Sequence, residues 1–369
     1  MACLSRIGGT GMTAGDQTGP QRIGRPVAGT RSRPTMGDVA AHAGVALKTV
    51  SRVVNGEPGV TPAMAERVRA AIDQLGFRRN DGARVLRKGQ TASIGLITED
   101  IADPFYSVLS RAVEDAARAQ GHLLLTGSSD EDPVRERELA LAFCARRVDG
   151  LIVIPASDDH TYLLPEISAG LATVFVDRPA GLIEADTVLS GNVEGAREGV
   201  SHLIRHGHRR IGYIGDAPRI YTSMLRHRGY REAMAQAGLR VDDAWVVMSS
   251  PSQDSIGLAL RQMLAGPNPV TALFFGNNRI SVAAVRELRA LAGTHELGQG
   301  PAFVGFDDFE LADMLSPGVT VMAQDVARLG RVAAELLFRR LAGDRGPAEH
   351  TEIATQLIER GSGEIPPSQ

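Results

Sequence analysis

Hydrophobic and polar positions follow two different periods along the chain. Between residues 35 and 76, apolar side chains recur three and four positions apart, which is the period of an α-helix. From residue 93 onward, short apolar runs alternate with amphipathic helical stretches. This change of period predicts a small all-α unit followed by a larger α/β unit with parallel sheets.

The α/β unit is too long for a single nucleotide-sized fold, since roughly 180 residues lie between the first strand and residue 275. We therefore expect two doubly wound subdomains. Strands are predicted over 93–98, 122–126, 150–155, 172–177, 210–214, 271–275 and 302–306. Helices are predicted over 107–119, 134–146, 193–206, 226–237 and 278–291.

The all-α unit carries strong local signals for helix ends. Thr35 and Asp38 fit a capping box, and Gly44 is placed to end the first helix. A second helix over about 46–54 would bury Val50 and Val53 and leave its other face exposed. Two short helices joined by a tight turn are typical of a helix-turn-helix, and a third helix follows between Thr61 and Gly76. An ordinary helical hairpin with solvated charges is the alternative interpretation.

Charge is distributed unevenly over these units. Residues 1–92 contain 14 basic and 6 acidic side chains, whereas the remainder contains 26 and 37. A basic head on an acidic body is the pattern of a nucleic-acid-binding module attached to a regulatory domain. No apolar stretch is long enough for a membrane span, no secretory signal is visible, and Cys3 and Cys144 form no disulfide framework. These features favour a cytoplasmic protein, and no cofactor or metal-binding spacing is recognisable.

The segment from Asp38 to Gly56, D-V-A-x-x-A-G-V-x-x-x-T-V-S-R-V-V-N-G, resembles the N-terminus of LacI/GalR-type bacterial transcription repressors. The resemblance implies a double-stranded DNA partner, contacted by the second helix. The residues it implicates are Leu47, Lys48, Thr49, Ser51, Arg52 and Asn55. Ala46 departs from the family, which usually has a capping Ser there, so phosphate anchoring is expected to be weaker. Leu47 is apolar at a base-reading position and suits a thymine methyl group.

Residues 80–89 match the hinge-helix pattern of the same family, N-x-x-A-R-x-L-R-x-G. Ten residues do not hold a helix alone in water, so the resemblance implies two hinges that fold together on DNA. Leu86 would then wedge into the minor groove, and Arg84, Arg87 and Lys88 would contact phosphates. This arrangement predicts a homodimer on a pseudo-palindromic operator. A plain flexible linker with a buried Leu is the alternative.

Three polar residues fall where ligands bind in open α/β sheets, near the carboxyl ends of strands. Asn277 and Asp307 follow predicted strands, and Arg226 is predicted to open a helix. The family uses an Arg, an Asn and an Asp at the matching positions to bind its effector. An Arg fork and a carboxylate suit neighbouring sugar hydroxyls. The alternatives are a helix cap for Asp307 and a solvated surface position for Arg226.

Three further residues are candidates for the same site. Phe105 could stack on a sugar face or simply pack in the core. Asp177 and Arg178 end a predicted strand and could bind ligand or form a structural pair.

The resemblance extends over about 34–360 and predicts the domain organisation. We expect a disordered extension over 1–33, a headpiece over 34–80 and a hinge over 81–92. The effector and dimerisation core should span 93–360, with subdomain 1 over about 93–190 and 320–345 and subdomain 2 over about 191–319 and 346–360. Residues 361–369, GSGEIPPSQ, are expected to form a flexible tail that cannot build a tetramerisation helix.

The predicted function is a sequence-specific DNA-binding transcription regulator, a repressor, controlled by a small carbohydrate. A sugar-binding receptor without a regulatory role and a regulator that responds to a nucleoside or purine are the alternatives. An enzyme is not expected, because no nucleophile elbow, phosphate-binding loop or strand-linked dinucleotide motif is present.

Overall fold

The computed structural model describes residues 34–78, 91–292 and 300–367. Its contacts divide the chain into two compact units, residues 1–80 and 81–369. The predicted extension over 1–33 and the hinge residues Arg84, Leu86, Arg87 and Lys88 lie outside the described ranges. Within those ranges, no helix is both long and apolar enough to cross a membrane.

The first unit consists of α1 (Met36–Ala43), α2 (Leu47–Asn55) and α3 (Pro62–Leu75). The predicted capping box is confirmed, since the Thr35 hydroxyl accepts from the Asp38 backbone N–H and the Asp38 carboxylate accepts from the Thr35 N–H. Gly44 ends α1 in the left-handed conformation, with φ of 61°. A small core forms where the three helices meet, with Val39, Val50 and Val68 fully buried.

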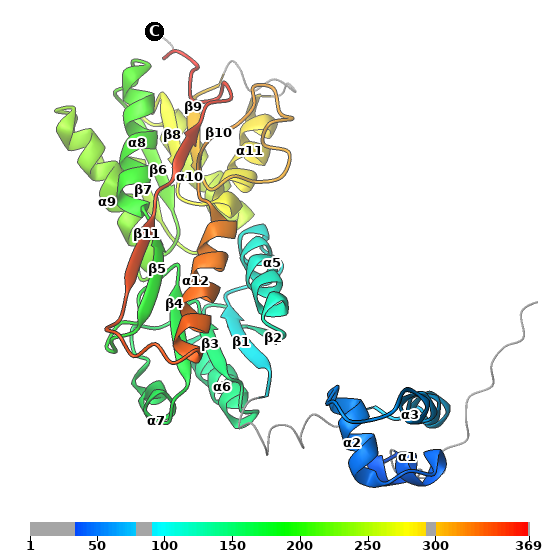
Figure 1. The fold of residues 1–369 in the computed structure, drawn as a ribbon. Coiled ribbons are helices and arrows are strands. Elements are labelled where there is room, and N and C mark those ends of the chain that lie inside the picture. Colours follow the sequence, from blue (N-terminus) through cyan, green and yellow to red (C-terminus); the bar gives the residue numbers. More distant parts are fainter. Residues whose placement is uncertain (1–33, 79–90, 293–299, 368–369) are drawn as a thin grey trace, which may run out of the picture. The chain divides into compact units, whose positions relative to one another are not determined.

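The second unit contains two parallel sheets, each with helices on both faces (Figure 1). This confirms the predicted α/β class with two doubly wound subdomains. The first sheet has the order β11-β5-β4-β3-β1-β2 and the second β12-β10-β9-β8-β6-β7. All strand pairs are parallel except β10 with β12.

The strands are β1 (Ser93–Thr98), β2 (Leu123–Ser128), β3 (Gly150–Val153), β4 (Ala172–Val176), β5 (Asp186–Ser190), β6 (Ile211–Gly215), β7 (Val246–Met248), β8 (Ala272–Phe275), β9 (Ala302–Phe306), β10 (Thr320–Ala323), β11 (His350–Ile353) and β12 (Gln356–Ile358). The helices are α5 (Pro104–Ala119), α6 (Pro133–Ala145), α7 (Leu164–Ser168), α8 (Asn192–Arg205), α9 (Tyr221–Gln236), α10 (Gln253–Ala265), α11 (Asn278–Ala292) and α12 (Val326–Leu341), with short 3₁₀ turns at Thr161–Leu163 and Asp243–Trp245.

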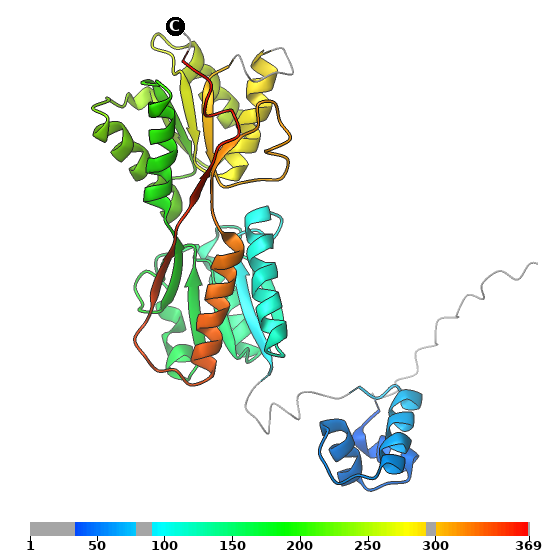
Figure 2. The ribbon, with the colours of Figure 1, turned by 45° about the horizontal axis from the view of Figure 1, so that its top comes forward.

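The chain passes between the subdomains three times, after β5, after β10 and after β11 (Figure 2). These crossovers correct the predicted subdomain ranges. Residues 320–323 form β10 in the second sheet, and residues 350–353 form β11 in the first. Both strands have only four residues, so neither produces a long enough hydrophobic pattern to show which sheet it joins.

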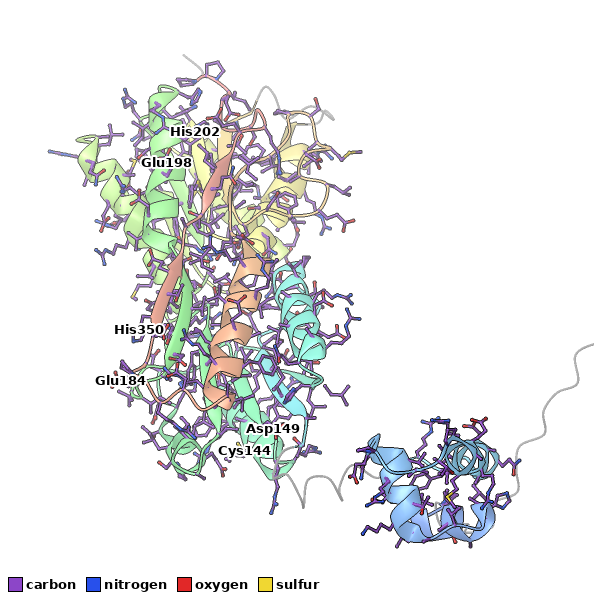
Figure 3. The ribbon with its side chains drawn as sticks, in the orientation of Figure 1. Cys144, Asp149, Glu184, Glu198, His202 and His350 are labelled. Carbon is purple, nitrogen blue, oxygen red and sulfur yellow. The ribbon has the colours of Figure 1, made fainter. Side chains whose placement is uncertain are left out.

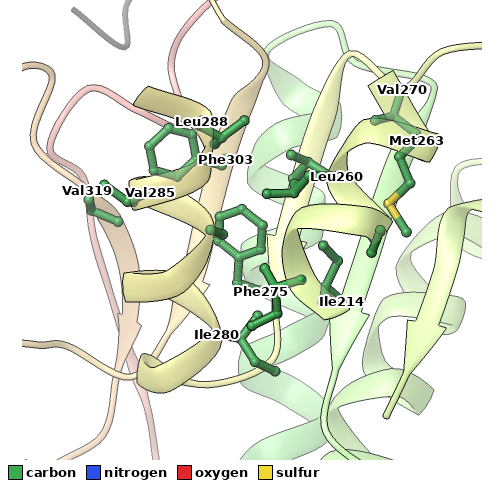
Figure 4. Packing of buried hydrophobic residues seen from close by; sticks show 14 of the residues in the cluster. Ile214, Leu260, Met263, Val270, Phe275, Ile280, Val285, Leu288, Phe303 and Val319 are labelled. Carbon is green, nitrogen blue, oxygen red and sulfur yellow. The ribbon is translucent and has the colours of Figure 1, made fainter. Parts of the chain in front are cut away.

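Each sheet separates two hydrophobic layers. In subdomain 1, α5 and α12 cover one face, and α6 and α7 lie over the other. In subdomain 2, α8 and α9 pack on one face and α10 and α11 on the other. Figure 4 shows the layer beneath α10 and α11, where Phe275, Leu260 and Phe303 interdigitate. These layers hold the strand ends that surround the ligand cleft in fixed positions.

The expected flexible tail is wrong for residues 361–367, which pack on subdomain 2. Ser362 is fully buried, and its carbonyl accepts from the Phe303 N–H. The Glu364 carboxylate lies 2.5 Å from His202 Nε2 and also accepts from the Thr320 hydroxyl. Figure 3 shows His202 on α8 near this end of the chain. Glu364 therefore anchors a segment whose Gly, Ser and Pro content predicted a loose tail.

Gly229 offers a direct test of the packing between α8 and α9. A Cβ at this position would collide with the Val193 carbonyl and lie 2.9 Å from the Ala196 Cβ. We expect Gly229→Ala to lower the free energy of unfolding by about 1–3 kcal/mol, because α9 would have to move away from α8. Urea unfolding measures this change. Gly257→Ala in α10 is the matched control, since its Cβ would meet only the movable ends of Arg261 and Glu287. Equal losses in the two variants would contradict the close packing.

Candidate nucleic-acid interface and ligand cleft

The outward face of α2 presents the side chains that the sequence predicts to contact DNA. Leu47 has 55% of its surface exposed, and Lys48 beside it is also exposed. Thr49, Ser51, Arg52 and Asn55 are half-buried on the same helix. The Asn55 amide donates to the Ser51 hydroxyl at 3.3 Å, which holds the end of this polar surface in place.

The turn between α1 and α2 is held by a residue that the sequence did not identify. Arg67 of α3 donates from Nη2 to the carbonyls of Ala43 and Gly44, at 2.8 and 3.0 Å. These carbonyls close α1, and a guanidinium there satisfies them and offsets the helix dipole. Ala46 provides no side-chain cap to α2, as its chemistry predicts.

The point where the chain enters the core is also fixed by polar contacts. The Thr91 N–H donates to Asp149 Oδ1 at 2.7 Å, and its hydroxyl donates to the Arg147 carbonyl. His122 Nε2 lies 3.4 Å from Asp149 Oδ2. Asp149, labelled in Figure 3, therefore joins the segment before β1 to the edge of the first sheet.

A cavity of about 50 Å³ lies between the carboxyl ends of the strands of the two sheets. This is the position where open α/β sheets bind ligands. All six predicted effector residues line it, together with Glu99, Asp103, Tyr106, Asp216, Ile220, Thr222, Ser223, Gly276, Asn278, Arg279 and Gln324.

Arg226 is the most heavily engaged residue of the cavity. It lies in the second turn of α9, which begins at Tyr221 rather than at Arg226 as predicted. Its guanidinium is buried and donates to Asn192 Oδ1 at 2.7 Å and to the Gly276 carbonyl at 2.8 Å. Nη1 also lies 3.4 Å from Asp307 Oδ2, and the guanidinium carbon sits 3.9 Å from the centre of the Phe306 ring. These contacts argue against the solvated-surface alternative.

Asp177 and Asp307 occupy matching places in the two subdomains. Each follows a strand and adopts a left-handed backbone, with φ of 69° and 70°. Each donates its N–H to the next strand, Asp177 to the Val188 carbonyl and Asp307 to that of Met322. This conformation is uncommon for a residue with a side chain, although Asp tolerates it better than most, and both residues line the cavity.

Burial raises the pKa of both carboxyl groups, although Arg178 and Arg226 oppose the shift at Asp177 and Arg226 opposes it at Asp307. Asp177 Oδ1 is buried without a hydrogen-bond partner among the described residues, and so is Gln324 Oε1. Gln324 donates its amide to Asp307 Oδ1 at 2.5 Å. Two acceptors on residues of the cavity wall therefore lack a partner among the described residues.

The other predicted residues line the cavity and also make structural contacts. Asn277 Oδ1 accepts from the Ile280 N–H and so caps α11, and its amide donates to Asp216 Oδ2 at 3.4 Å in the cavity wall. Phe105 lines the cavity and packs edge-on against Tyr106, with ring centres 5.0 Å apart. Arg178 donates to the Pro155 carbonyl and contacts Glu99 and Glu131, so its contacts favour a structural role.

Several cavity residues that directly follow strands were not predicted from the sequence. Glu99 follows β1, Asp216 follows β6 and Gln324 follows β10. Because strand ends position ligand groups, each of these residues could have been identified from its place after a strand. Glu131 has no such signal, since its contact with Arg178 joins loops that are distant in sequence.

Glu99 generates a prediction about pH. Burial, together with a hydrogen bond to Glu131 and the charge of Glu131, raises its pKa from 4.5 to about 7. A carboxyl whose folded-state pKa is raised favours the folded protein below the unfolded-state pKa, and that benefit is lost as the pH rises through about 7. We expect Glu99→Gln to make the decline of unfolding free energy between about pH 5 and 7 shallower. Urea unfolding across this range measures it, with Glu198→Gln on α8 as control. Identical slopes in wild type and Glu99→Gln would be inconsistent with the shifted pKa.

Two family models match the chain. The model of bacterial regulatory proteins, lacI family, matches residues 35–80, and that of the periplasmic binding protein-like domain matches residues 200–363. The HTH-type transcriptional regulator CelR of Thermobifida fusca is 33% identical and aligns over 90% of this chain and 99% of its own length. The ribose operon repressor of Escherichia coli K12 is 31% identical over 89% and 99%.

Solved structures of similar regulators resemble this chain in fold. The complex of transcriptional regulator CelR with cellobiose has a TM-score of 0.65 and 30% identity, and covers 89% of this chain and 100% of that chain. The lac repressor dimer bound to operator and the anti-inducer ONPF has a TM-score of 0.79 over 90% and 99%. At 24% identity, the second likeness concerns the fold alone. CelR and the ribose operon repressor share more than 30% of their residues with this chain over nearly their full length. The chain therefore belongs to the lacI family of bacterial regulatory proteins and is a helix-turn-helix transcription regulator.

Proposed function

We propose that the protein is a repressor that binds a pseudo-palindromic operator as a homodimer and is controlled by a sugar in the inter-subdomain cavity. The observation that carries this proposal is the set of buried polar groups around Arg226, Asp177 and Asp307. Such a set is costly to bury unless a ligand completes its hydrogen bonds. A receptor without a regulatory role would leave the helix-turn-helix unit without a purpose.

The unsatisfied groups suit hydroxyls in particular. Asp177 Oδ1 and Gln324 Oε1 need hydrogen-bond donors. Among the described contacts, Arg226 uses Nε and Nη1, so Nη2 can still donate. The Asn277 amide donates one hydrogen to Asp216 and has a second one to donate. A hydroxyl both donates and accepts, whereas an ammonium only donates and a phosphate mainly accepts. A polyhydroxylated ring therefore matches this cavity best, and the relatives named for ribose and cellobiose support a sugar.

An exposed face of subdomain 1 supports the proposed homodimer. α5 and α12 lie side by side, and between them is an outward groove of about 460 Å³. Val108 and several alanines form its apolar floor, and Arg111, Asp115, Arg331 and Glu335 flank it. Alternating charges around an apolar strip are self-complementary under two-fold symmetry.

Lys48 is expected to read a base edge. Lys48→Ala should cost about 1–3 kcal/mol on the true operator and relax the preference at one base pair, because a lost base contact removes discrimination at that position. Binding titrations against operator variants measure both effects. Arg69→Ala, an exposed basic residue of α3, is the control. A uniform loss across all DNA sequences would show that Lys48 contacts phosphate instead.

Asp177 and Asp307 are expected to hold the sugar. Asp177→Asn and Asp307→Asn should each weaken sugar binding by about tenfold or more, because a desolvated partner loses its charge-assisted hydrogen bond. Operator binding without sugar should remain near that of the wild type. Operator titrations with and without a sugar panel test this expectation.

Asp308→Asn is the matched control for these variants, since its carboxylate pairs with Arg360 at 2.6 Å and does not line the cavity. If a sugar active on the wild type acted equally on Asp177→Asn and Asp307→Asn, the site would be assigned wrongly.

A further inference from the structure

Charged residues of the two subdomains meet across the cleft at the edge away from the crossovers. Glu99 Oε1 lies 3.3 Å from Arg279 Nη1, and Glu131 Oε2 lies 3.6 Å from Arg219 Nη1. Both acids belong to subdomain 1 and both bases to subdomain 2. These two ion pairs are called the mouth pairs below.

Sheet topology explains why these pairs lie at the mouth of the cleft. The crossovers follow β5, β10 and β11, so they lie near the β11 and β12 edges of the sheets. Glu99 and Glu131 follow β1 and β2 at the opposite edge, and Arg219 follows β6, next to the edge strand β7. The crossovers stand at the connected edge, so a ligand longer than the cavity would extend away from it, towards the mouth pairs.

The cavity behind the mouth pairs is small. Its volume of about 50 Å³ corresponds to a few water molecules, since each needs about 10–15 Å³ on this measure. Glu99 and Arg279 belong to its wall, and an amide hydrogen bond of 2.9 Å from Asn278 to Asp103 joins the subdomains beside them. A single sugar ring therefore requires the cleft to open, and a second ring would also require the mouth pairs to separate.

The acidic members of the mouth pairs are held firmly, whereas the basic members are exposed. The Glu99 and Glu131 side chains are only 16% and 13% exposed, and both contact Arg178. Arg219 and Arg279 are 58% and 50% exposed. A second sugar ring would displace these arginines and leave the Glu99 and Glu131 carboxyl groups with Arg178 and, at Glu99, the Tyr106 hydroxyl. Loss of an ion pair at a poorly exposed carboxyl group disfavours the ligand that causes it, which is a way to reject a competing ligand.

We propose that the mouth pairs close the cleft over a single sugar ring and so make the protein selective for monosaccharides over disaccharides. This inference rests on the proposed sugar-responsive function. In this proposal Arg219 and Arg279 determine the size of the ligand, whereas other residues hold the first sugar ring.

Calorimetric titration of the full-length wild type with D-ribose, D-glucose, cellobiose and maltose tests the inference. At least one monosaccharide should bind about tenfold more tightly than either disaccharide. In the Arg219→Ala/Arg279→Ala double variant, this preference should fall to about threefold or less, because the exposed side chains no longer fill the mouth. Arg240→Ala, an exposed residue of subdomain 2 outside the cavity lining, should keep the wild-type preference. Operator binding and thermal unfolding establish that each variant is folded.

A disaccharide that binds the wild type as tightly as any monosaccharide would overturn the size selection and leave the sugar-responsive function standing. An unchanged preference in a folded double variant would overturn the role of Arg219 and Arg279. If no sugar of either size bound the wild type, the proposed function itself would fail, and this inference with it.

Discussion

The buried guanidinium of Arg226 requires partners, and the parts of subdomain 2 that surround the cleft are arranged to provide them. Asn192 accepts from it at the start of α8, directly after the first crossover. The Gly276 carbonyl and Asp307 come from the ends of β8 and β9, and Phe306 offers the face of its ring. An unpaired charge at this depth would cost several kcal/mol, so these segments are constrained to keep their relative positions.

The same contacts connect the ligand cavity to the crossovers. Asn192 follows the first crossover, and Gln324, which donates to Asp307, lies within the second. A sugar that completed the hydrogen bonds of Asp177 and Asp307 would therefore join the two subdomains directly and act on the segments that connect them. A ligand shifts such an equilibrium only through different affinities for the two arrangements. Asp177 contributes from subdomain 1 and Arg226 from subdomain 2, so only a closed cleft brings both to the ligand.

Local signals made the helix-turn-helix unit and most central strands predictable. Thr35, Asp38 and Gly44 act within one helix, and their geometry follows from short-range hydrogen bonds. The edge strands β7, β11 and β12 were missed because each has only three or four residues and an incompletely buried pattern. The anchored segment around Glu364 was missed because its partners, His202 and Thr320, are remote in sequence.

The convergence of Arg226, Asn277 and Asp307 on one cavity followed from the rule that ligands bind at strand ends. The exact partners of the cavity residues could not be predicted in this way, because contacts such as Glu131 with Arg178 depend on how separate loops meet in three dimensions.

In the proposed function, one sugar-filled cleft controls DNA affinity. Measuring the affinity of an active sugar for the protein alone and for the protein saturated with operator DNA tests this control. Thermodynamic linkage requires the two sugar affinities to differ by the same factor by which the sugar changes operator affinity. We expect this equality, with a factor clearly different from one. Identical sugar affinities with and without operator would contradict it.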